Sequence, residues 1–245
     1  MSGAPVILII GASGGIGSAT AELLGQQNFR LILSSRNQEK LDSVAAKYNT
    51  LKIKCDATDE ASVADLMDRA LQTHGRVDGI IHAVGSMLLK PAHITTLEEF
   101  TSTLTTNLIS SFLILKHGAK AMFGSGGSMV FFSTVATGIG LPNHEAIGAA
   151  KAGIDGLVIS AAATYASKNI RVNAVAPGLT NTPLASRITG NDASLKASVA
   201  LHPLGRIGNP EDIASAAAWL VDPGQSWITG QIIRVDGGLS AVRGR

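Results

Sequence analysis

Apolar and polar positions along the chain follow one repeating order, in which short runs rich in valine and isoleucine precede longer stretches of helical period. The apolar runs fall at 6–11, 30–35, 51–55, 77–85, 128–133, 170–178 and 231–238. The stretches that predict helices lie between them, at about 15–27, 38–48, 60–74, 97–123, 145–167 and 210–221. Continuous apolar strands separated by helices indicate a parallel sheet covered on both faces. With right-handed crossovers, this order predicts a doubly wound α/β fold of the Rossmann type.

One stretch, residues 179–209, breaks this order, because it is long, polar and without a clear apolar period. No proline- or serine-rich linker and no internal repeat divides the rest of the chain. We therefore predict a single domain over residues 1–245, with 179–209 as a loop-like lid over a substrate site.

Composition narrows the class of protein further. Hydrophobic residues make up 45% of the 245 residues and charged residues 16%, which excludes a disordered chain. The net charge of +2 is too small to indicate binding to nucleic acid or to a membrane surface. Cys55 is the only cysteine, so an internal disulfide is excluded. The sequence shows neither a signal-peptide pattern nor an apolar run of bilayer-spanning length, and we predict a cytoplasmic protein.

The stretch "GASGGIG" (11–17) follows the first apolar run and opens the first predicted helix. Gly11 permits a tight turn there, while Gly15 and Gly17 allow the backbone and helix to approach a pyrophosphate closely. The helix N-terminus adds free N–H groups and the positive end of its dipole. The candidate dinucleotide-binding residues of this loop are Gly11, Ser13, Gly14, Gly15, Ile16 and Gly17.

The end of the second apolar run indicates which dinucleotide is bound. An NAD site usually places Asp or Glu there, to bind the ribose 2′-hydroxyl. This chain reads "SSRN", without a carboxylate, and Ser35 and Arg36 are suited to a 2′-phosphate. We therefore expect NADP rather than NAD, although an arginine at a helix start is also typical of a solvated surface.

Several motifs together resemble those of the short-chain dehydrogenase/reductase family, and in particular its ketoacyl-reductase-like branch. They are "GASGGIG" (11–17), "CDATD" (55–59), "HAVG" (82–85), "TTNLIS" (105–110), "AAKAG" (149–153), "RVNAVAPGLTNTPL" (171–184), "PLGRIGNPEDIA" (203–214) and "ITGQIIRVDGG" (228–238). The resemblance covers essentially the whole chain. It implies a sheet of about seven strands, a small-molecule substrate, and a homotetramer or dimer built partly from the helix that contains Lys151.

The resemblance also assigns roles to individual residues. Those implied to bind the cofactor are Asp56 and Ala57 at the adenine, Ala83, Val84 and Gly85 after the fourth strand, Lys151 at the nicotinamide ribose, and Pro177, Gly178, Thr180 and Thr182 around the nicotinamide amide. Asn107 matches the active-site asparagine, which holds a chain of water molecules in the family. His82 and Val84 depart from the usual Asn-Ala-Gly pattern.

At two positions the chain departs from the catalytic residues of the family. Ile147 occupies the place of the family's catalytic tyrosine, and Thr134 occupies the place of its catalytic serine. Thr134 keeps a hydroxyl group and can still orient a substrate oxygen. The neighbouring Ser133 is expected to face the other way if the strand continues to it. Ile147 cannot donate a proton, and the loss of a positioned acid lowers a rate by roughly 10²–10⁴-fold.

His144 is our candidate for a replacement acid. Residues 144, 147 and 151 are three and four positions apart and share a helix face, so His144 and Lys151 flank Ile147. A histidine ordinarily titrates near neutral pH and can donate a proton there. The same position also suits a capping or surface histidine. His82 and His93 could approach the cleft as well. We expect no metal site, because position 148 lacks the second histidine of an H-E-x-x-H motif.

Two functions remain open from the sequence. The first is an NADP-dependent oxidoreductase with an altered proton relay, in which Asn107, Thr134, Lys151 and His144 carry the chemistry. The second is a dinucleotide-binding sensor or assembly protein without turnover. The segment "SMLLKPA" (86–92) would form an apolar cleft wall, and Arg187 is the lid's strong anion contact. A small or medium, partly hydrophobic carbonyl substrate fits these features.

Overall fold

A single seven-stranded parallel sheet forms the centre of the computed structural model, which describes residues 3–27, 29–48 and 50–243. The strand order is β3-β2-β1-β4-β5-β6-β7, and every neighbouring pair is parallel. The strands are β1 (Val6–Ile10), β2 (Arg30–Ser35), β3 (Leu51–Lys54), β4 (Gly79–His82), β5 (Gly127–Phe132), β6 (Ile170–Pro177) and β7 (Ile232–Val235). The order reverses between β1 and β4, which is where ligands bind in open α/β sheets.

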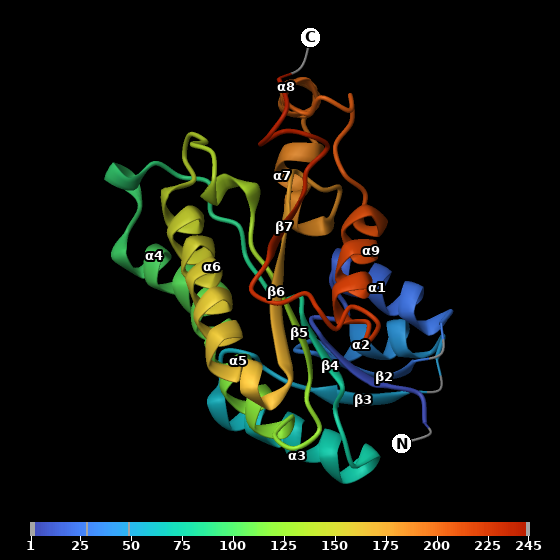
Figure 1. The fold of residues 1–245 in the computed structure, drawn as a ribbon. Helices are drawn as coiled ribbons and strands as arrows, with labels where there is room; N and C mark the ends of the chain where they lie inside the picture. Colours follow the sequence, from blue (N-terminus) through green and yellow to red (C-terminus); the bar gives the residue numbers. More distant parts are fainter. Residues whose placement is uncertain (1–2, 28, 49, 244–245) are drawn as a thin grey trace.

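Helices cover both faces of this sheet (Figure 1). One face carries α3 (Glu60–His74), α5 (Ser110–Ala121) and α6 (Glu145–Tyr165). The other carries α1 (Gly15–Gly25), α2 (Gln38–Ala45) and α9 (Pro210–Val221). The fold is therefore the doubly wound Rossmann-type sheet that the sequence predicts.

Alternation of side chains along the strands explains why both faces can be apolar. Leu8 and Ile10 of β1 belong to the core beneath α3, α5 and α6, whereas Ile7 and Ile9 belong to the core beneath α1, α2 and α9. Successive side chains of a strand point to opposite faces, so a strand covered on both sides must be apolar throughout. The continuous runs in the sequence follow from this arrangement.

The single helix predicted at 97–123 is divided into three elements in the structure. It consists of α4 (Leu97–Leu104), a π-helical turn at Thr105–Ile109, and α5. Asn107 lies within the π-helical turn. Because π-helical turns are rare and occur often at functional sites, the position of this one is informative.

The prediction of a loop-like lid is wrong in its secondary structure. Residues 179–209 contain a 3-10 turn (Pro183–Ala185), α7 (Ser186–Thr189) and α8 (Asp192–Leu201). Neither α7 nor α8 contains a buried residue, which explains why their sequences show no clear apolar period. Asn191 caps α8 by accepting a hydrogen bond from the Ser194 N–H. The two helices stand beyond the carboxyl end of β6 (Figure 1).

Helix α6 corrects the expectation that the chain has no apolar segment of spanning length. Residues Glu145–Lys168 are long and apolar enough to cross a membrane by length and composition alone. However, Ile154 and Val158 of this helix are buried in the core against the sheet. We therefore describe α6 as a core helix.

Candidate active site

The glycine-rich loop between β1 and α1 has a shape that only glycine allows at two positions. Gly11 has φ +84°, and a Cβ atom there would lie 2.7 Å from the Ala83 carbonyl carbon and oxygen. A Cβ at Gly17 would overlap the Gly11 carbonyl oxygen. The loop is therefore folded tightly on itself and pressed against the end of β4.

The first turn of α1 offers a site for an anion. Its N-cap is Gly14, which provides no side-chain hydrogen bond, and the turn holds no acidic residue. Helix N–H groups at such an end favour a negative group. Gly15 faces the segment after β6, since a Cβ there would lie 2.9 Å from the Thr182 Cγ2. The structure thus brings together two segments that the sequence assigned to one cofactor.

Polar side chains gather beside this loop at the end of β2. Ser13 Oγ and Ser35 Oγ are 2.5 Å apart and share a hydrogen bond. Asp56 accepts hydrogen bonds from the Thr58 N–H (2.9 Å) and hydroxyl (2.7 Å). These bonds and the charge of Arg36 lower the pKa of Asp56. Ala57, beside them, is buried.

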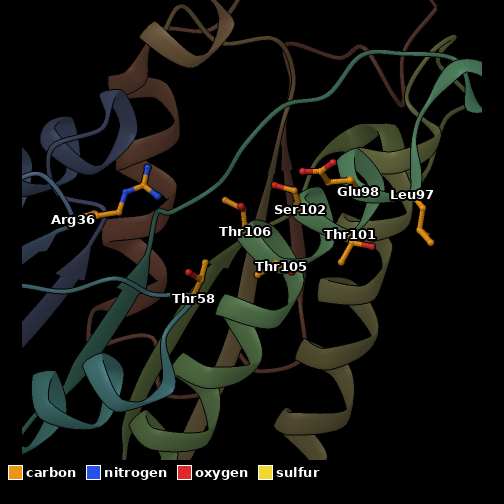
Figure 2. A pocket seen from close by; sticks show the side chains of 8 residues that line it. All are labelled: Arg36, Thr58, Leu97, Glu98, Thr101, Ser102, Thr105 and Thr106. Carbon is orange, nitrogen blue, oxygen red and sulfur yellow. The ribbon is translucent and has the colours of Figure 1, made fainter.

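Arg36 borders a cavity of about 680 Å³ that extends from β2 to α4. Figure 2 shows Arg36 on one side and Ser102 and Thr106 on the other. Thr58 lines the same cavity and bonds to Asp56, so the cavity places Arg36 next to the Asp56 segment.

Asn107 and Lys151 both lie close to Gly85, in the loop after β4. A Cβ at Gly85 would lie 3.0 Å from Asn107 Oδ1 and 3.6 Å from Lys151 Nζ. Asn107 is fully buried; its Nδ2 donates to the Thr103 carbonyl (2.9 Å) and to Ser86 Oγ (2.9 Å). Its Oδ1 accepts from the Ser86 N–H at 3.2 Å. The asparagine therefore fixes the loop after β4 to the π-helical turn.

The Lys151 ammonium group is buried at the end of β5. Its Nζ donates to the Phe132 carbonyl oxygen at 2.8 Å. Burial lowers the pKa of Lys151 from 10.5 to about 8, and the charge of Asp155, one turn further along α6, opposes this shift. An ammonium of this kind releases a proton more readily than a solvated lysine.

His82 is a buried group that the sequence analysis named only in passing. Its Nε2 lies 3.0 Å from Ser110 Oγ, and Ser110 Oγ donates to the Thr106 carbonyl at 2.7 Å. With the serine hydrogen used in that way, His82 Nε2 is the donor and Nδ1 carries a lone pair, which has no partner among the described residues. Burial, and then the charge of Lys151, lower the pKa of His82 to about 3, so its ring is neutral.

Thr134 and Ile147 lie at the positions where the resemblance places the catalytic serine and tyrosine. Thr134 is half-buried, and its Oγ1 accepts from the Ala136 N–H at 3.3 Å, so its hydroxyl hydrogen is available. Ile147 is buried within the first turns of α6. Ser133 is buried, and its hydroxyl has no partner among the described residues.

His144 caps the N-terminus of α6 without making a side-chain capping bond. Its Nδ1 lies 2.7 Å from the Pro142 carbonyl oxygen, to which it donates. The ring is half-buried and makes no other hydrogen bond to the described part of the chain. Both the donor hypothesis and the surface hypothesis for His144 therefore remain open.

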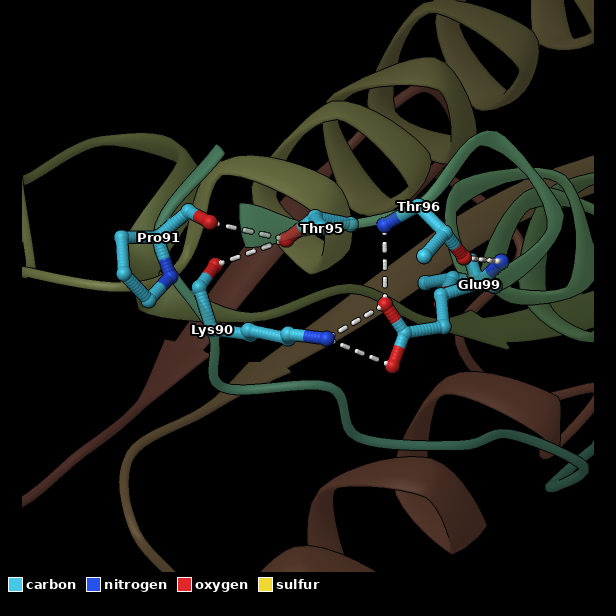
Figure 3. A network of polar contacts seen from close by, with 6 residues as sticks. Lys90, Pro91, Thr95, Thr96 and Glu99 are labelled. Atoms are coloured by element: carbon cyan, nitrogen blue, oxygen red, sulfur yellow. Dashed lines mark hydrogen bonds and ion pairs between the residues drawn. The ribbon is translucent and has the colours of Figure 1, made fainter. Parts of the chain in front are cut away.

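The loop at residues 84–96, which has a 3-10 turn at Ala92–Ile94, contains the stretch 86–92 that the sequence predicts as a cleft wall, and it is held at both sides. Lys90 Nζ contacts both carboxylate oxygens of Glu99, at 2.9 and 2.7 Å (Figure 3). Glu99 also accepts from the Thr96 N–H in a capping box that begins α4. On the other side, the Lys90 N–H donates to the Asn143 carbonyl at 2.9 Å. This wall is thus tied both to α4 and to the segment that starts α6.

The segment after β6 is fixed to β7 and to the end of α8. The Gly178 N–H donates to the Val235 carbonyl, and Thr180 Oγ1 donates to the Gly178 carbonyl at 3.1 Å. A Cβ at Gly178 would lie 2.8 Å from His202 Nε2, which belongs to the end of α8. This segment, with Pro177, Gly178, Thr180 and Thr182, therefore lies between the glycine-rich loop, which Thr182 approaches at Gly15, and the end of α8.

The fold and the glycine-lined loop define a Rossmann-type α/β protein. A family model described as enoyl-(acyl carrier protein) reductase matches residues 11–240. The chain belongs to the short-chain dehydrogenase/reductase family, a family of oxidoreductases.

Three known proteins illustrate this relationship. A cis-4-hydroxycyclohexanecarboxylate dehydrogenase of Sinomonas cyclohexanicum is 38% identical, with 97% of each chain covered. A short-chain dehydrogenase/reductase from Mycobacterium ulcerans superposes with a TM-score of 0.93 and 30% identity, covering 100% of this chain and 93% of the other. The structure of ElxO with NADP bound has a TM-score of 0.91 and 27% identity, covering 98% of this chain and all of the other.

Sequence reasoning missed several polar residues beneath the site. Ser86, Thr103, Ser110 and Ser111 hold Asn107 and the π-helical turn through hydrogen bonds. The sequence does not indicate which backbone carbonyl a serine or threonine side chain within a helix will bond. The one available clue was the spacing of Ser110 and Ser111, three and four residues after Asn107.

Proposed function

We propose that this protein is an NADP-dependent oxidoreductase that reduces a small or medium carbonyl compound with an altered proton relay. The observation that carries the proposal is the convergence of Gly85, Asn107 and Lys151 beside the glycine-lined loop. A binding protein without turnover would also use the loop and Lys151 to hold a dinucleotide, but it has no use for the Thr134 hydroxyl, which donates no hydrogen bond to the described residues.

The residues present fit a nicotinamide dinucleotide. The uncapped first turn of α1 and the close-packed Gly11 and Gly17 suit a pyrophosphate. Arg36 and Ser35 would hold the 2′-phosphate, and Asp56 and Ala57 the adenine. Lys151 would hold the nicotinamide ribose. When bound, such a cofactor supplies the hydride. The solved structure of ElxO contains NADP, which supports this choice.

The chain's own groups would orient the substrate and supply the proton. The Thr134 hydroxyl donates to the substrate oxygen and aligns it. The lid helices α7 and α8 and the 84–96 loop exclude water from the reacting carbonyl. Residue 147 has no proton to give, so the proton comes from another group; His144 and Lys151 are the two titratable candidates on that face of α6.

A six-membered alicyclic ring is the substrate class that we propose to test first. The 38% identical relative is named for a hydroxycyclohexanecarboxylate, a ring alcohol that carries a carboxylate. In this chain, the wall at 86–92 is largely apolar, and Arg187 of α7 is exposed on the lid. An apolar ring packed against that wall with an anionic group directed to Arg187 would fit both features.

The experiment that tests the function is NADPH oxidation by the purified protein. Cyclohexanones with and without a ring carboxylate, simple aldehydes and β-keto thioesters form the panel, and Ile147→Tyr is assayed beside the native chain. Turnover by the native protein supports the proposal. Turnover by Ile147→Tyr alone would favour a dinucleotide-binding protein that has lost its proton donor, because the variant restores only the phenol.

We also propose that the protein self-associates, as a tetramer or dimer, in the cytoplasm. Trp227 is 98% exposed in the single chain, and β7 presents an open edge next to it in sequence. A second apolar face on α5 and α6 contains Phe112 and Ile159, both exposed. Apolar surface of this kind and open strand edges are typical of protein interfaces.

Trp227→Gln should weaken this association by at least about tenfold, because a buried tryptophan is often among the residues that dominate an interface. Sedimentation velocity over a range of concentrations measures the change. Leu97→Gln is the matched control, since Leu97 is 78% exposed but lies on α4, outside both faces. If neither variant changes the measured mass of the assembly, Trp227 does not lie in the interface.

A further inference from the structure

The proposed reduction needs a proton donor, and no phenol in the chain can take the place of residue 147. Of the two tyrosines, Tyr48 packs against Gly25 at the end of α1. Tyr165 ends α6 and contacts Phe123. At 1.5 Å per residue, Tyr165 lies about 27 Å from Ile147 along the helix axis. The donor must therefore be of another chemical kind.

Lys151 lies one helical turn after Ile147, on the same buried face of α6. Its Nζ is held by the carbonyl oxygen of Phe132, two residues before Thr134. An ammonium has three N–H groups, and two of them are not used by any hydrogen bond to the described residues. Lys151 is thus anchored to the backbone at the end of β5, two residues before Thr134, and a substrate oxygen aligned by the Thr134 hydroxyl would lie near this end of the strand.

The other titratable groups around Lys151 cannot supply the proton as readily. His82 of β4 is neutral, and its Nε2–H is engaged with Ser110. Asp155, four residues further along α6, is a carboxylate whose charge stabilises the ammonium. His144 is held by the Pro142 carbonyl at the outer end of α6. Lys151, by contrast, is buried and lies near Gly85 together with Asn107.

We propose that the Lys151 ammonium group is the proton source for the reduction, acting directly or through one water molecule, in place of the residue at position 147. This inference rests on the proposed function. The carbonyl carbon receives the hydride as NADPH is oxidised to NADP⁺. One N–H bond of Lys151 breaks, an O–H bond forms on the substrate, and the neutral amine regains its proton from solvent.

The surroundings of Lys151 set the pH range of this step. Burial lowers its pKa to about 8. The ammonium therefore predominates below about pH 8, and the amine predominates above it. The reduction should be independent of pH below this range and fall about tenfold per pH unit above it, because only the protonated form donates. The apolar side chain of Ile147, which is buried beside Lys151, contributes to the burial that sets this range.

Lys151→Arg is the sharpest test, because arginine keeps the positive charge for binding a ribose but does not release a proton at these pH values. We expect its turnover to fall by roughly 10²–10⁴-fold. We expect its Kd for NADPH, measured by fluorescence titration, to change by less than about tenfold. Lys151→Ala should be restored in part by added primary amines such as methylamine. Lys168→Arg, on the exposed turn after α6, is the control and should behave as the native protein.

A second measurement does not depend on turnover. The reactivity of Lys151 toward acetic anhydride, measured by mass spectrometry in the cofactor-free protein, should rise with a midpoint near pH 8. Turnover that survives Lys151→Arg, or that is lost instead in His144→Gln, would overturn the inference and leave the proposed function intact. If the native protein oxidises NADPH with no compound of the panel, the function and the inference fail together.

Discussion

Gly17→Ala should reduce dinucleotide affinity by roughly 100-fold, which is the loss expected when about two N–H bonds to an anion, at about 1.5 kcal/mol each, lose their geometry. A Cβ at this position would overlap the Gly11 carbonyl oxygen and crowd Ala12, so the loop and the start of α1 must separate. The overlap involves backbone atoms, which cannot move aside as a side chain can. Isothermal titration with NADPH measures the effect directly.

The same substitution should lower the free energy of unfolding by about 1–3 kcal/mol, the usual cost of inserting a methyl group into a packed site. Gly156→Ala is the matched control. A Cβ there meets nothing within 4 Å, and alanine stabilises a helix interior relative to glycine by about 0.8–1 kcal/mol. Full NADPH affinity in Gly17→Ala would show that the loop does not hold the pyrophosphate.

Arg36→Glu should reverse the preference for NADPH over NADH. A charge-assisted hydrogen bond contributes about 1.5–3 kcal/mol, so its loss alone weakens NADPH binding by roughly 10–100-fold. The new carboxylate would also repel the 2′-phosphate, and it could accept a hydrogen bond from the 2′-hydroxyl of NADH. The ratio of the two Kd values, measured by fluorescence titration, checks the prediction.

Arg69→Glu is the control for net charge, because Arg69 lies on α3 and pairs with Asp65 on the surface. If Arg36→Glu and Arg69→Glu change the two affinities equally, only the overall charge matters. In that case Arg36 would not contact the cofactor, and the preference for NADP would have to rest on other residues.

The strands and most helices could be predicted from the sequence because their causes are local. A strand covered on both faces is apolar throughout, and α3 begins and ends at its predicted residues, 60 and 74, since Asp59 caps one end and Gly75 takes the left-handed conformation at the other. The secondary structure of residues 179–209 was predicted wrongly for the opposite reason. Its helices bury no side chain, so no apolar period marks them.

The candidate site could be predicted only in part. Two of its features are visible as sequence motifs: the glycine-rich loop at 11–17, and Lys151, one helical turn after residue 147. The neutral state of His82 is not, because it follows from complete burial beneath α5 and from the charge of a residue 69 positions later. The Asn107 bonds to Ser86 likewise depend on how the loop after β4 meets the π-helical turn.

The π-helical turn at Thr105–Ile109 acts as a change of phase within one long helix. Each residue of an α-helix advances the side-chain direction by about 100°, so one extra residue in a turn rotates everything after it by that amount relative to everything before it. The Asn107 side chain, within the turn, bonds to the Thr103 carbonyl one turn earlier and to Ser86, while the stretch after the turn directs Leu113 and Ile114 into the core. The turn thus lets one long helix both fix the loop after β4 through Asn107 and pack against the sheet.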